Sequence, residues 1–101
     1  MTELARWYLE RDGVPTPVTL DEWLKWAAAD YPGGTVGLTT VKEAEVSTVF
    51  LSLEHHPPGS FYETMIFRGP HDLDQWRYRT RAEALAGHTR IVDALVRGDE
   101  P

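Results

Sequence analysis

The residues best suited to chemistry lie at the end of a predicted strand, in the run Glu54-His55-His56. A carboxylate beside imidazole groups can bind a metal ion or exchange protons with a substrate. If the strands on either side of this run pair as a hairpin, Glu63 comes close to Glu54, and His71 stands in a nearby loop. One hypothesis is therefore a small metal-dependent hydrolase that uses Glu54, His55 and Glu63.

A structural interpretation competes with this hypothesis. Side-by-side His residues on a strand point to opposite faces, and a ligand spacing such as His-x-x-x-His is missing. Polar residues at strand ends commonly cap backbone groups. The chain has no Cys, which excludes a thiol nucleophile, a thiolate zinc site and an iron–sulfur cluster. We therefore predict no catalytic residue, no metal and no cofactor.

A second group is aromatic and basic, and it lies on a short predicted strand that contains Trp76-Arg77-Tyr78-Arg79. Alternation places Trp76 and Tyr78 on one sheet face and the two arginines on the other. With Arg68 on the neighbouring strand, Arg77 and Arg79 could bind a small anionic, nucleotide-like ligand. In the competing interpretation the aromatic residues face the core and the arginines make weak surface ion pairs.

Two residues on the predicted helices are further candidates. His88 falls on the apolar stripe of the last helix with Leu85 and Val92, so we expect a core histidine, with a functional role as the alternative. Trp26 lies at the edge of the first helix's stripe, roughly 60° from Trp23. It is a candidate anchor for a protein partner or a second subunit, or it seals the rim of the core.

The elements that position these residues follow from capping and turn signals. Thr19 with Glu22, and Thr80 with Glu83, predict capping boxes that begin helices over 20–30 and 81–97. Alternation and residue preference predict the strands. The predicted strands cover residues 6–10, 35–42, 46–54, 61–68 and 75–79.

The predicted order is β-α-β-β-β-β-α, and short connections favour a mostly antiparallel sheet of four to five strands. Two helices on one face of such a sheet make a single two-layer α+β domain over residues 1–98, with a frayed tail at 99–101. Pro15 and Pro17 keep the segment before the first helix extended. Strand 46–54 is apolar on both faces, which predicts a central position with both faces covered.

Composition narrows the possible partners. The 101 residues suffice for one domain, and the net charge of −6 repels nucleic-acid phosphates, so no direct nucleic-acid binding is expected. An acidic surface still suits a basic protein face. The absence of Cys favours a reducing compartment, and no signal peptide or membrane-spanning run is visible. We expect a cytoplasmic protein without a membrane partner.

Four motifs extend over most of the chain: VSTVFLSLEHH, FYETMIFRG, WRYRT and EALAGH. Together they resemble a family of small uncharacterised proteins of tailed phages, prophages and actinobacteria, whose first two motifs read STVFLGLDH and LFETMVFGG. The shared positions are His55, Glu63, Thr64, Tyr78, Gly87 and His88. The chain departs from the pattern at Ser52 and Arg68, where glycine is usual, at Glu54, where Asp is usual, and at Phe61-Tyr62, where Leu-Phe is usual.

This resemblance implies an accessory protein in the cytoplasm of a bacterial host, with a role such as countering host defence. We predict a non-enzymatic binding protein that binds a protein partner or sequesters a small anionic ligand. The alternatives are the hydrolase described above and a structural or assembly component of a phage particle. The last alternative predicts a homo-oligomer.

Overall fold

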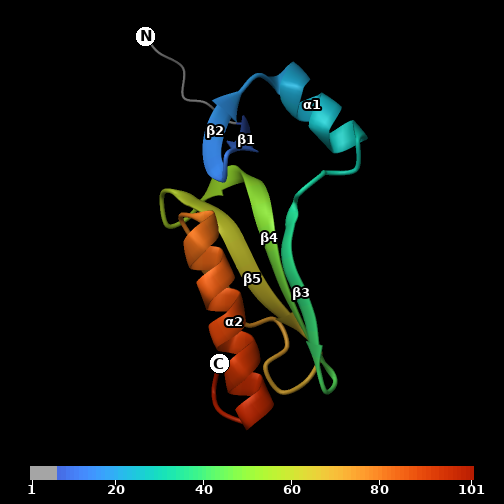
Figure 1. Cartoon of the computed structure of the whole chain (residues 1–101), viewed down its shortest axis with the longest axis vertical. Coiled ribbons are helices and arrows are strands. Elements are labelled where there is room, and N and C mark those ends of the chain that lie inside the picture. The colour runs from blue at the N-terminus through green and yellow to red at the C-terminus, as the bar shows by residue number, and fades with distance from the viewer. Residues whose placement is uncertain (1–6) are drawn as a thin grey trace.

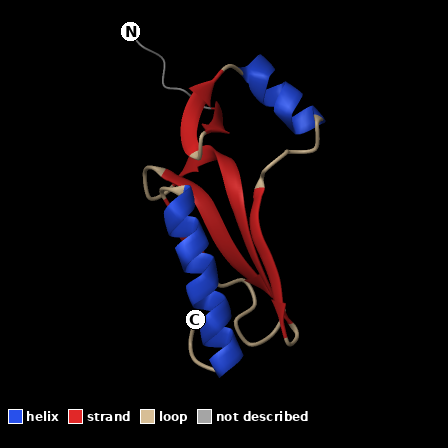
Figure 2. Ribbon diagram, in the orientation of Figure 1, coloured by secondary structure: helices blue, strands red, loops and turns tan. Residues whose placement is uncertain are grey.

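The computed structural model describes residues 7–101, in which a four-stranded antiparallel sheet carries one long helix on one face (Figures 1 and 2). This is the α+β fold that the sequence predicts. The elements in chain order are β1 (Trp7–Arg11), β2 (Val14–Val18), α1 (Leu20–Ala28), β3 (Thr35–Val41), β4 (Ala44–His55), β5 (Ser60–Phe67), β6 (Gln75–Tyr78) and α2 (Arg81–Arg97).

The main sheet has the strand order β3-β4-β5-β6, with every neighbouring pair antiparallel. The predicted central position of β4 is confirmed, because β3 and β5 flank it. The prediction that both faces of β4 are covered is wrong. Residues along β4 alternate between buried and half-buried, because α2 covers one face of the sheet and the other face stays open (Figure 1).

The first two strands form a separate two-stranded sheet. Their turn residues Asp12 and Gly13 both have positive φ, 54° and 76°, as the tightest hairpin turns require. The segment predicted as extended is β2, and its residues Pro15 and Pro17 pair with Glu10 and Tyr8. Proline is tolerated there because β2 is a sheet edge and needs no further backbone donor.

A polar clamp joins this hairpin to the main sheet and to α2. The Tyr62 hydroxyl donates to the Glu10 carboxylate at 2.6 Å, and Arg81 donates to both oxygens of the same carboxylate at 2.9 and 3.1 Å. Burial and the hydrogen bond to Glu10 raise the pKa of Tyr62 far above its usual value. The clamp therefore links three elements that are distant in the sequence.

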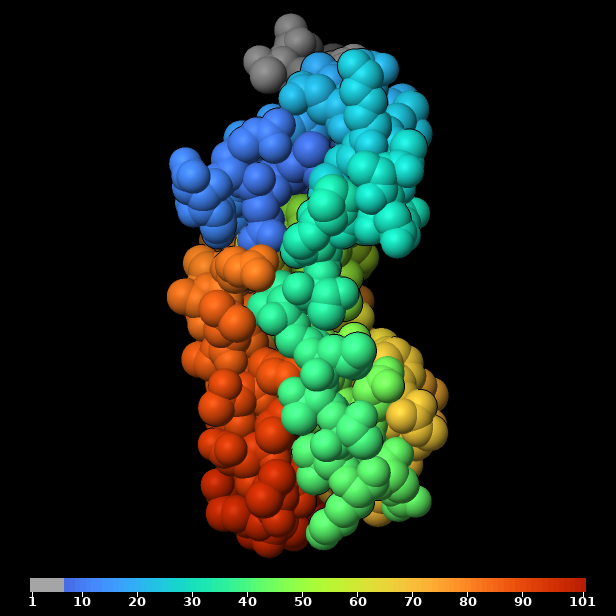
Figure 3. Space-filling view, turned by 45° about the vertical axis from the view of Figure 1, so that its right-hand side comes forward, coloured from blue at the N-terminus to red at the C-terminus, as the bar shows by residue number. Residues whose placement is uncertain are grey.

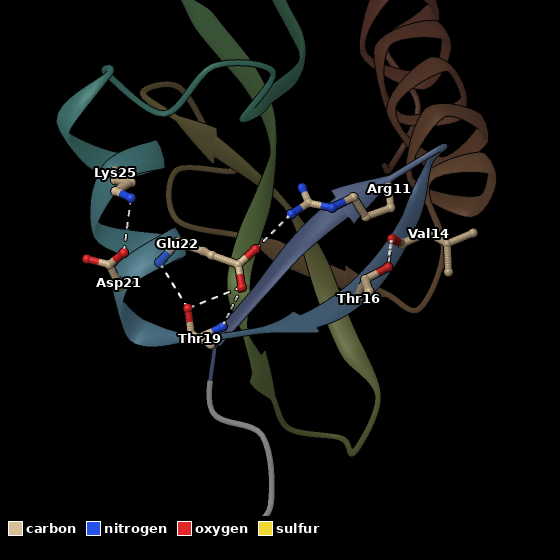
Figure 4. Close-up of polar contacts among 7 residues, drawn as sticks. All are labelled: Arg11, Val14, Thr16, Thr19, Asp21, Glu22 and Lys25. Atoms are coloured by element: carbon tan, nitrogen blue, oxygen red, sulfur yellow. Dashed lines mark hydrogen bonds and ion pairs between the residues drawn. The ribbon is translucent and has the colours of Figure 1, made fainter.

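Helix α1 begins with the predicted capping box, in which Thr19 and Glu22 satisfy each other's backbone N–H groups (Figure 4). An ion pair of 3.3 Å joins Glu22 to Arg11 of β1, and the rings of Trp7 and Trp23 stack with centroids 4.8 Å apart. The prediction that both helices lie on one sheet face is wrong. Contacts with β1 instead hold α1 at the end of the molecule that carries the hairpin (Figure 1).

The core beneath α2 consists of two hydrophobic clusters, one toward each end of the sheet. Residues of α2 reach both clusters, but the buried face of the helix is rotated from the predicted stripe, and Leu85 is exposed. The buried members of the clusters are Ala44, Val46, Ile66 and Ile91 in one, and Phe50, Tyr62, Tyr78 and Ala84 in the other. Within residues 7–101, no helix is long and apolar enough to cross a membrane.

Candidate functional site

The side chains of Glu54 and His55 are engaged with the loop that follows β4. The Gly59 N–H donates to the Glu54 carboxylate at 2.7 Å, and His55 Nδ1 lies 2.9 Å from the Leu53 carbonyl oxygen. The strand register places Glu63 opposite Val49 rather than beside Glu54. The hairpin prediction for β4 and β5 is therefore confirmed, but the hydrolase residues do not converge.

The remaining members of that group also have other partners. Glu63 pairs with Arg77 at 3.0 Å, and Arg77 donates further to the His56 carbonyl oxygen at 2.6 Å. His71 lies in the loop before β6, where its Nδ1 is 3.4 Å from the Asp74 carboxylate. Among the described residues, no three His, Asp or Glu side chains gather closely enough to hold a metal ion. The hydrolase hypothesis thus has no assembled set of residues to support it.

Of the three candidate arginines, Arg68 lies apart from the other two, which both reach the loop after β4. Arg68 pairs with Glu45 at 3.5 Å, just beyond one end of β5, and Arg77 pairs with Glu63 near the middle. The Arg79 guanidinium lies against Gly59, just before the other end of β5. The eight residues of β5 span roughly 26 Å at 3.3 Å per residue. One small anion cannot contact all three side chains.

The predicted alternation on β6 is confirmed. Trp76 is opposite Thr64 and Tyr78 is opposite Tyr62, on the face that α2 covers, while Arg77 is opposite Glu63 on the open face. Tyr78 and Trp76 therefore contribute to the core, as the competing interpretation of this motif held.

A chain of hydrogen bonds lies between the two hydrophobic clusters. His88 Nε2 is 2.9 Å from Thr39 Oγ1, and its Nδ1 is 2.7 Å from Thr48 Oγ1. Thr48 is 2.5 Å from the Thr64 hydroxyl, which accepts a bond of 3.1 Å from Tyr78. Thr48 and Thr64 are fully buried. We call these five residues the polar layer.

The polar layer is satisfied when His88 is neutral. Tyr78 then donates to Thr64, Thr64 to Thr48, and Thr48 to His88 Nδ1, so these three hydroxyl protons have acceptors, and His88 Nε2–H donates to Thr39. Burial lowers the pKa of His88, in agreement with a neutral ring. This geometry fits the predicted core histidine, with hydroxyl partners, and it accounts for the shared Thr64, Tyr78 and His88 without chemistry.

Trp26 lines the feature with the clearest capacity to bind another molecule. Its indole N–H donates to the Pro32 carbonyl oxygen at 2.8 Å, and its ring meets Tyr31 and Phe50 edge-on at centroid distances of 5.3 and 6.1 Å. The Gly34 carbonyl oxygen accepts the Phe50 N–H at 2.8 Å, which joins the loop after α1 to β4. Trp26 also packs against the hydrophobic cluster that contains Phe50 and Tyr62, as the alternative of a residue that seals the rim of the core predicts.

An open groove of about 470 Å³ lies at this junction, and we call it the α1–β4 groove. Its aromatic and apolar surface comes from α1, the following loop and β4. The lining residues are Trp26, Asp30, Tyr31, Gly34, Thr35, Val49, Phe50, Leu51 and Ser52. The groove is open to solvent, and its lining mixes apolar and polar groups.

Three side chains of the groove are attached to backbone in the left-handed region, which disfavours every residue except glycine, Asn and Asp. The φ angles are 70° at Asp30, 51° at Tyr31 and 62° at Ser52. Each such conformation costs about 1–3 kcal/mol for an unsuited residue, and strain of this kind concentrates at functional sites.

The polar group of the groove is the Asp30 carboxylate, which is exposed and has no hydrogen bond or ion pair to any side chain within residues 7–101. The aromatic rings of Trp26 and Tyr31 line the same groove. A carboxylate next to aromatic rings is suited to an organic cation, which gains both ion pairing and cation–π attraction. The groove therefore favours a Lys or Arg side chain.

Sequence reasoning identified Trp26 but not the rest of the groove. Asp30 and Tyr31 read as the end of a helix before Pro32-Gly33-Gly34, and nothing in their spacing predicts that they turn back over β4. The available signal was the short connection between the end of α1 at Ala28 and the start of β3 at Thr35. A chain that reverses direction over so few residues must use unusual φ angles.

Comparison of the chain with known proteins gives no match among protein-family models, curated proteins or solved structures. Its functional interpretation depends on the residues described above.

Proposed function

We propose that this chain is a non-enzymatic binding protein that docks a basic protein partner, whose Lys or Arg side chain enters the α1–β4 groove. The observation that carries the proposal is the convergence of Trp26, Tyr31 and the unpaired Asp30 carboxylate on one groove. Aromatic residues in preformed pockets supply much of the binding energy of protein interfaces. Rigid support of Trp26 limits the entropy lost on binding.

Charge supports the same choice of partner. The chain carries a net charge of −6, so its field attracts basic partners and repels acidic ones. Complex formation should therefore weaken as salt concentration rises. This role also suits the accessory protein of a bacterial host that the phage-type resemblance implies, including one that occupies a defence protein. The predicted sequestration of an anion by all three arginines finds less support, since Arg68 lies apart from Arg77 and Arg79.

Defined peptides test the proposal directly. The probe set is a short apolar peptide with Lys, Arg, norleucine or Glu at its central position. Binding is followed by NMR shifts of the Trp26 indole N–H. We expect the Lys and Arg peptides to shift this signal saturably, and the norleucine and Glu peptides to bind at least about tenfold more weakly, a difference of about 1.4 kcal/mol.

The variant Asp30→Asn removes the charge and keeps a residue that tolerates positive φ, so the fold is preserved. The matched control is Asp93→Asn, an exposed carboxylate on α2 with the same change of charge. We expect Asp30→Asn to abolish the preference for Lys and Arg, and Asp93→Asn to keep it. Equal binding of the Lys and norleucine peptides, or shifts that map away from the groove, would contradict the proposal.

A further inference from the structure

Strand β3 is a free edge of the main sheet, and it lacks the features that normally protect an edge. Its seven residues, TVGLTTV, include no charged residue and no Pro. Natural sheet edges usually carry Lys, Pro or a strong bulge, or are very short. The other edge, β6, has four residues and includes Arg77. The irregularity in β3 is confined to its start, between Thr35 and Gly37.

The backbone of β3 presents unpaired groups on its outer side. Val41 and Ala44 flank the two-residue turn to β4, and in antiparallel pairs hydrogen-bonded and non-bonded positions alternate. The N–H and C=O groups of Leu38 and Thr40 therefore point away from β4. Within residues 7–101, β4 is the strand that pairs with β3, and the outer side has none. Leu38 is central in the strand and 60% exposed.

The flank of α2 next to this edge is apolar. His88 contacts Thr39 of β3, whereas Gly87 lies against Tyr78 of β6. The helix positions that lie beyond His88 around the axis, on the side away from Gly87, are therefore on the β3 side. Those positions are held by Leu85, Val92 and Val96.

Leu85 and Val96 are 47% and 61% exposed on this flank. Leu85 also borders the surface formed by Arg90, Asp93 and Arg97. Strand β3 and helix α2 run side by side along the molecule in Figure 3. We call β3 together with Leu85, Val92 and Val96 of α2 the β3 edge strip.

We propose that two copies of this chain pair through β3, antiparallel about a two-fold axis at Leu38. The two Leu38 residues would exchange both of their outward N–H···O=C bonds, as the facing residues of a hydrogen-bonded pair do. The two sheets would become one of eight strands, with both α2 helices on the same face. The strip would then shelter Leu85 and Val96 of each copy.

Charge distinguishes a second copy from other occupants of this strip. Two chains of net charge −6 repel each other, and they approach most easily along a surface without acidic residues. Strand β3 itself has no charged side chain, so a basic partner would find no complementary group on the strand. An isologous antiparallel strand pair also satisfies both edges at once.

The contact is modest in size. A seven-residue strand is about 23 Å long, so each copy would contribute only one short strand and one helix flank to the contact. We therefore expect a reversible dimer whose population rises with concentration, rather than a permanent one. This inference rests on β3 and α2, and it stands or falls separately from the groove.

Sedimentation equilibrium from micromolar to millimolar concentration tests the dimer on the full chain. The test variants are Leu38→Lys and Leu85→Lys, which change exposed side chains and should leave the fold intact. The control is Leu73→Lys in the loop before β6, where the leucine is 63% exposed. We expect the dissociation constant to rise by about tenfold or more in both strip variants and to stay unchanged in the control.

Hydrogen exchange provides a second readout. Because dimerisation covers the outward amides, the Leu38 and Thr40 N–H groups should become more protected as wild-type concentration increases. A wild-type chain that is monomeric at millimolar concentration would overturn the proposal. It would also be overturned if both strip variants associated as strongly as the wild type, since the interface would then lie elsewhere.

Discussion

Gly87 offers the sharpest test of how the core is built. It lies on the buried face of α2, directly under the ring of Tyr78. A Cβ atom at this position would lie 2.5 Å from Cζ of Tyr78 and still closer to Cε1 and Oη. Favourable contacts between carbon atoms lie at about 3.5–4.0 Å, so Tyr78 or the helix must move in the variant Gly87→Ala.

The expected change in stability follows from three contributions. At an ordinary helix position Gly→Ala stabilises by about 1 kcal/mol. Overpacking opposes this with a cost of about 1–3 kcal/mol. Displacement of the ring also breaks the Tyr78–Thr64 hydrogen bond, and a buried polar group left unpaired costs about 1–3 kcal/mol. We expect a net loss of about 3 kcal/mol, or a Tm lower by about 12–24 °C for a domain of this size.

Thermal and urea unfolding of four variants measures this loss. In the background Tyr78→Ala the obstacle is gone, so Gly87→Ala should be neutral or stabilise by up to about 1 kcal/mol. The exposed neighbour provides the propensity control, since Ala86→Gly should cost about 1 kcal/mol. If Gly87→Ala is as stable as the wild type, or costs the same with and without Tyr78, the packing argument fails.

Two further predictions concern titration and backbone strain. Burial lowers the pKa of His88, so only the unfolded state gains a proton as the pH falls below about 6.5. The free energy of unfolding should therefore decrease from that pH until the lowered pKa is reached. Urea titrations should show a smaller decrease in the variant His88→Gln, and an equal decrease would refute the assignment. Arg68 has a φ of 69° and an exposed ion pair, so Arg68→Gly should be more stable than Arg68→Ala by about 1 kcal/mol in the same assay. The opposite order, usual at negative φ, would contradict the strained geometry.

The polar layer gives a physical reading of several motif positions. Thr64, Tyr78 and His88 form one hydrogen-bond chain, and Gly87 makes room for the Tyr78 ring against α2. A hydrogen-bonded layer between two apolar clusters permits few alternative packings, because a shift of α2 along the sheet would leave buried hydroxyls unpaired. These positions therefore specify the placement of α2 and need no catalytic explanation.

Local signals in the sequence determined the elements. The N-caps Thr19 and Thr80 fixed the starts of α1 and α2, the two prolines kept the residues of β2 extended, and alternation assigned Arg77 and its aromatic neighbours to opposite faces. At α2 the predicted capping box is incomplete, because the Glu83 carboxylate accepts the Arg79 N–H rather than the Thr80 N–H. These features depend on residues within a few positions of one another, where capping, turn geometry and the pleat act directly. The α+β class follows from them.

Only the tertiary structure decided which distant residues meet. It placed α1 against β1 through Trp23 and Glu22 rather than on the sheet, and it left one face of β4 open. It also brought Asp30 and Tyr31 beside β4 to form the groove. Such contacts depend on strand register, on bulges and on the balance of burial across the whole chain. The spacing of residues in the sequence does not indicate that balance, so the α1–β4 groove and the β3 edge strip could not be predicted from the sequence.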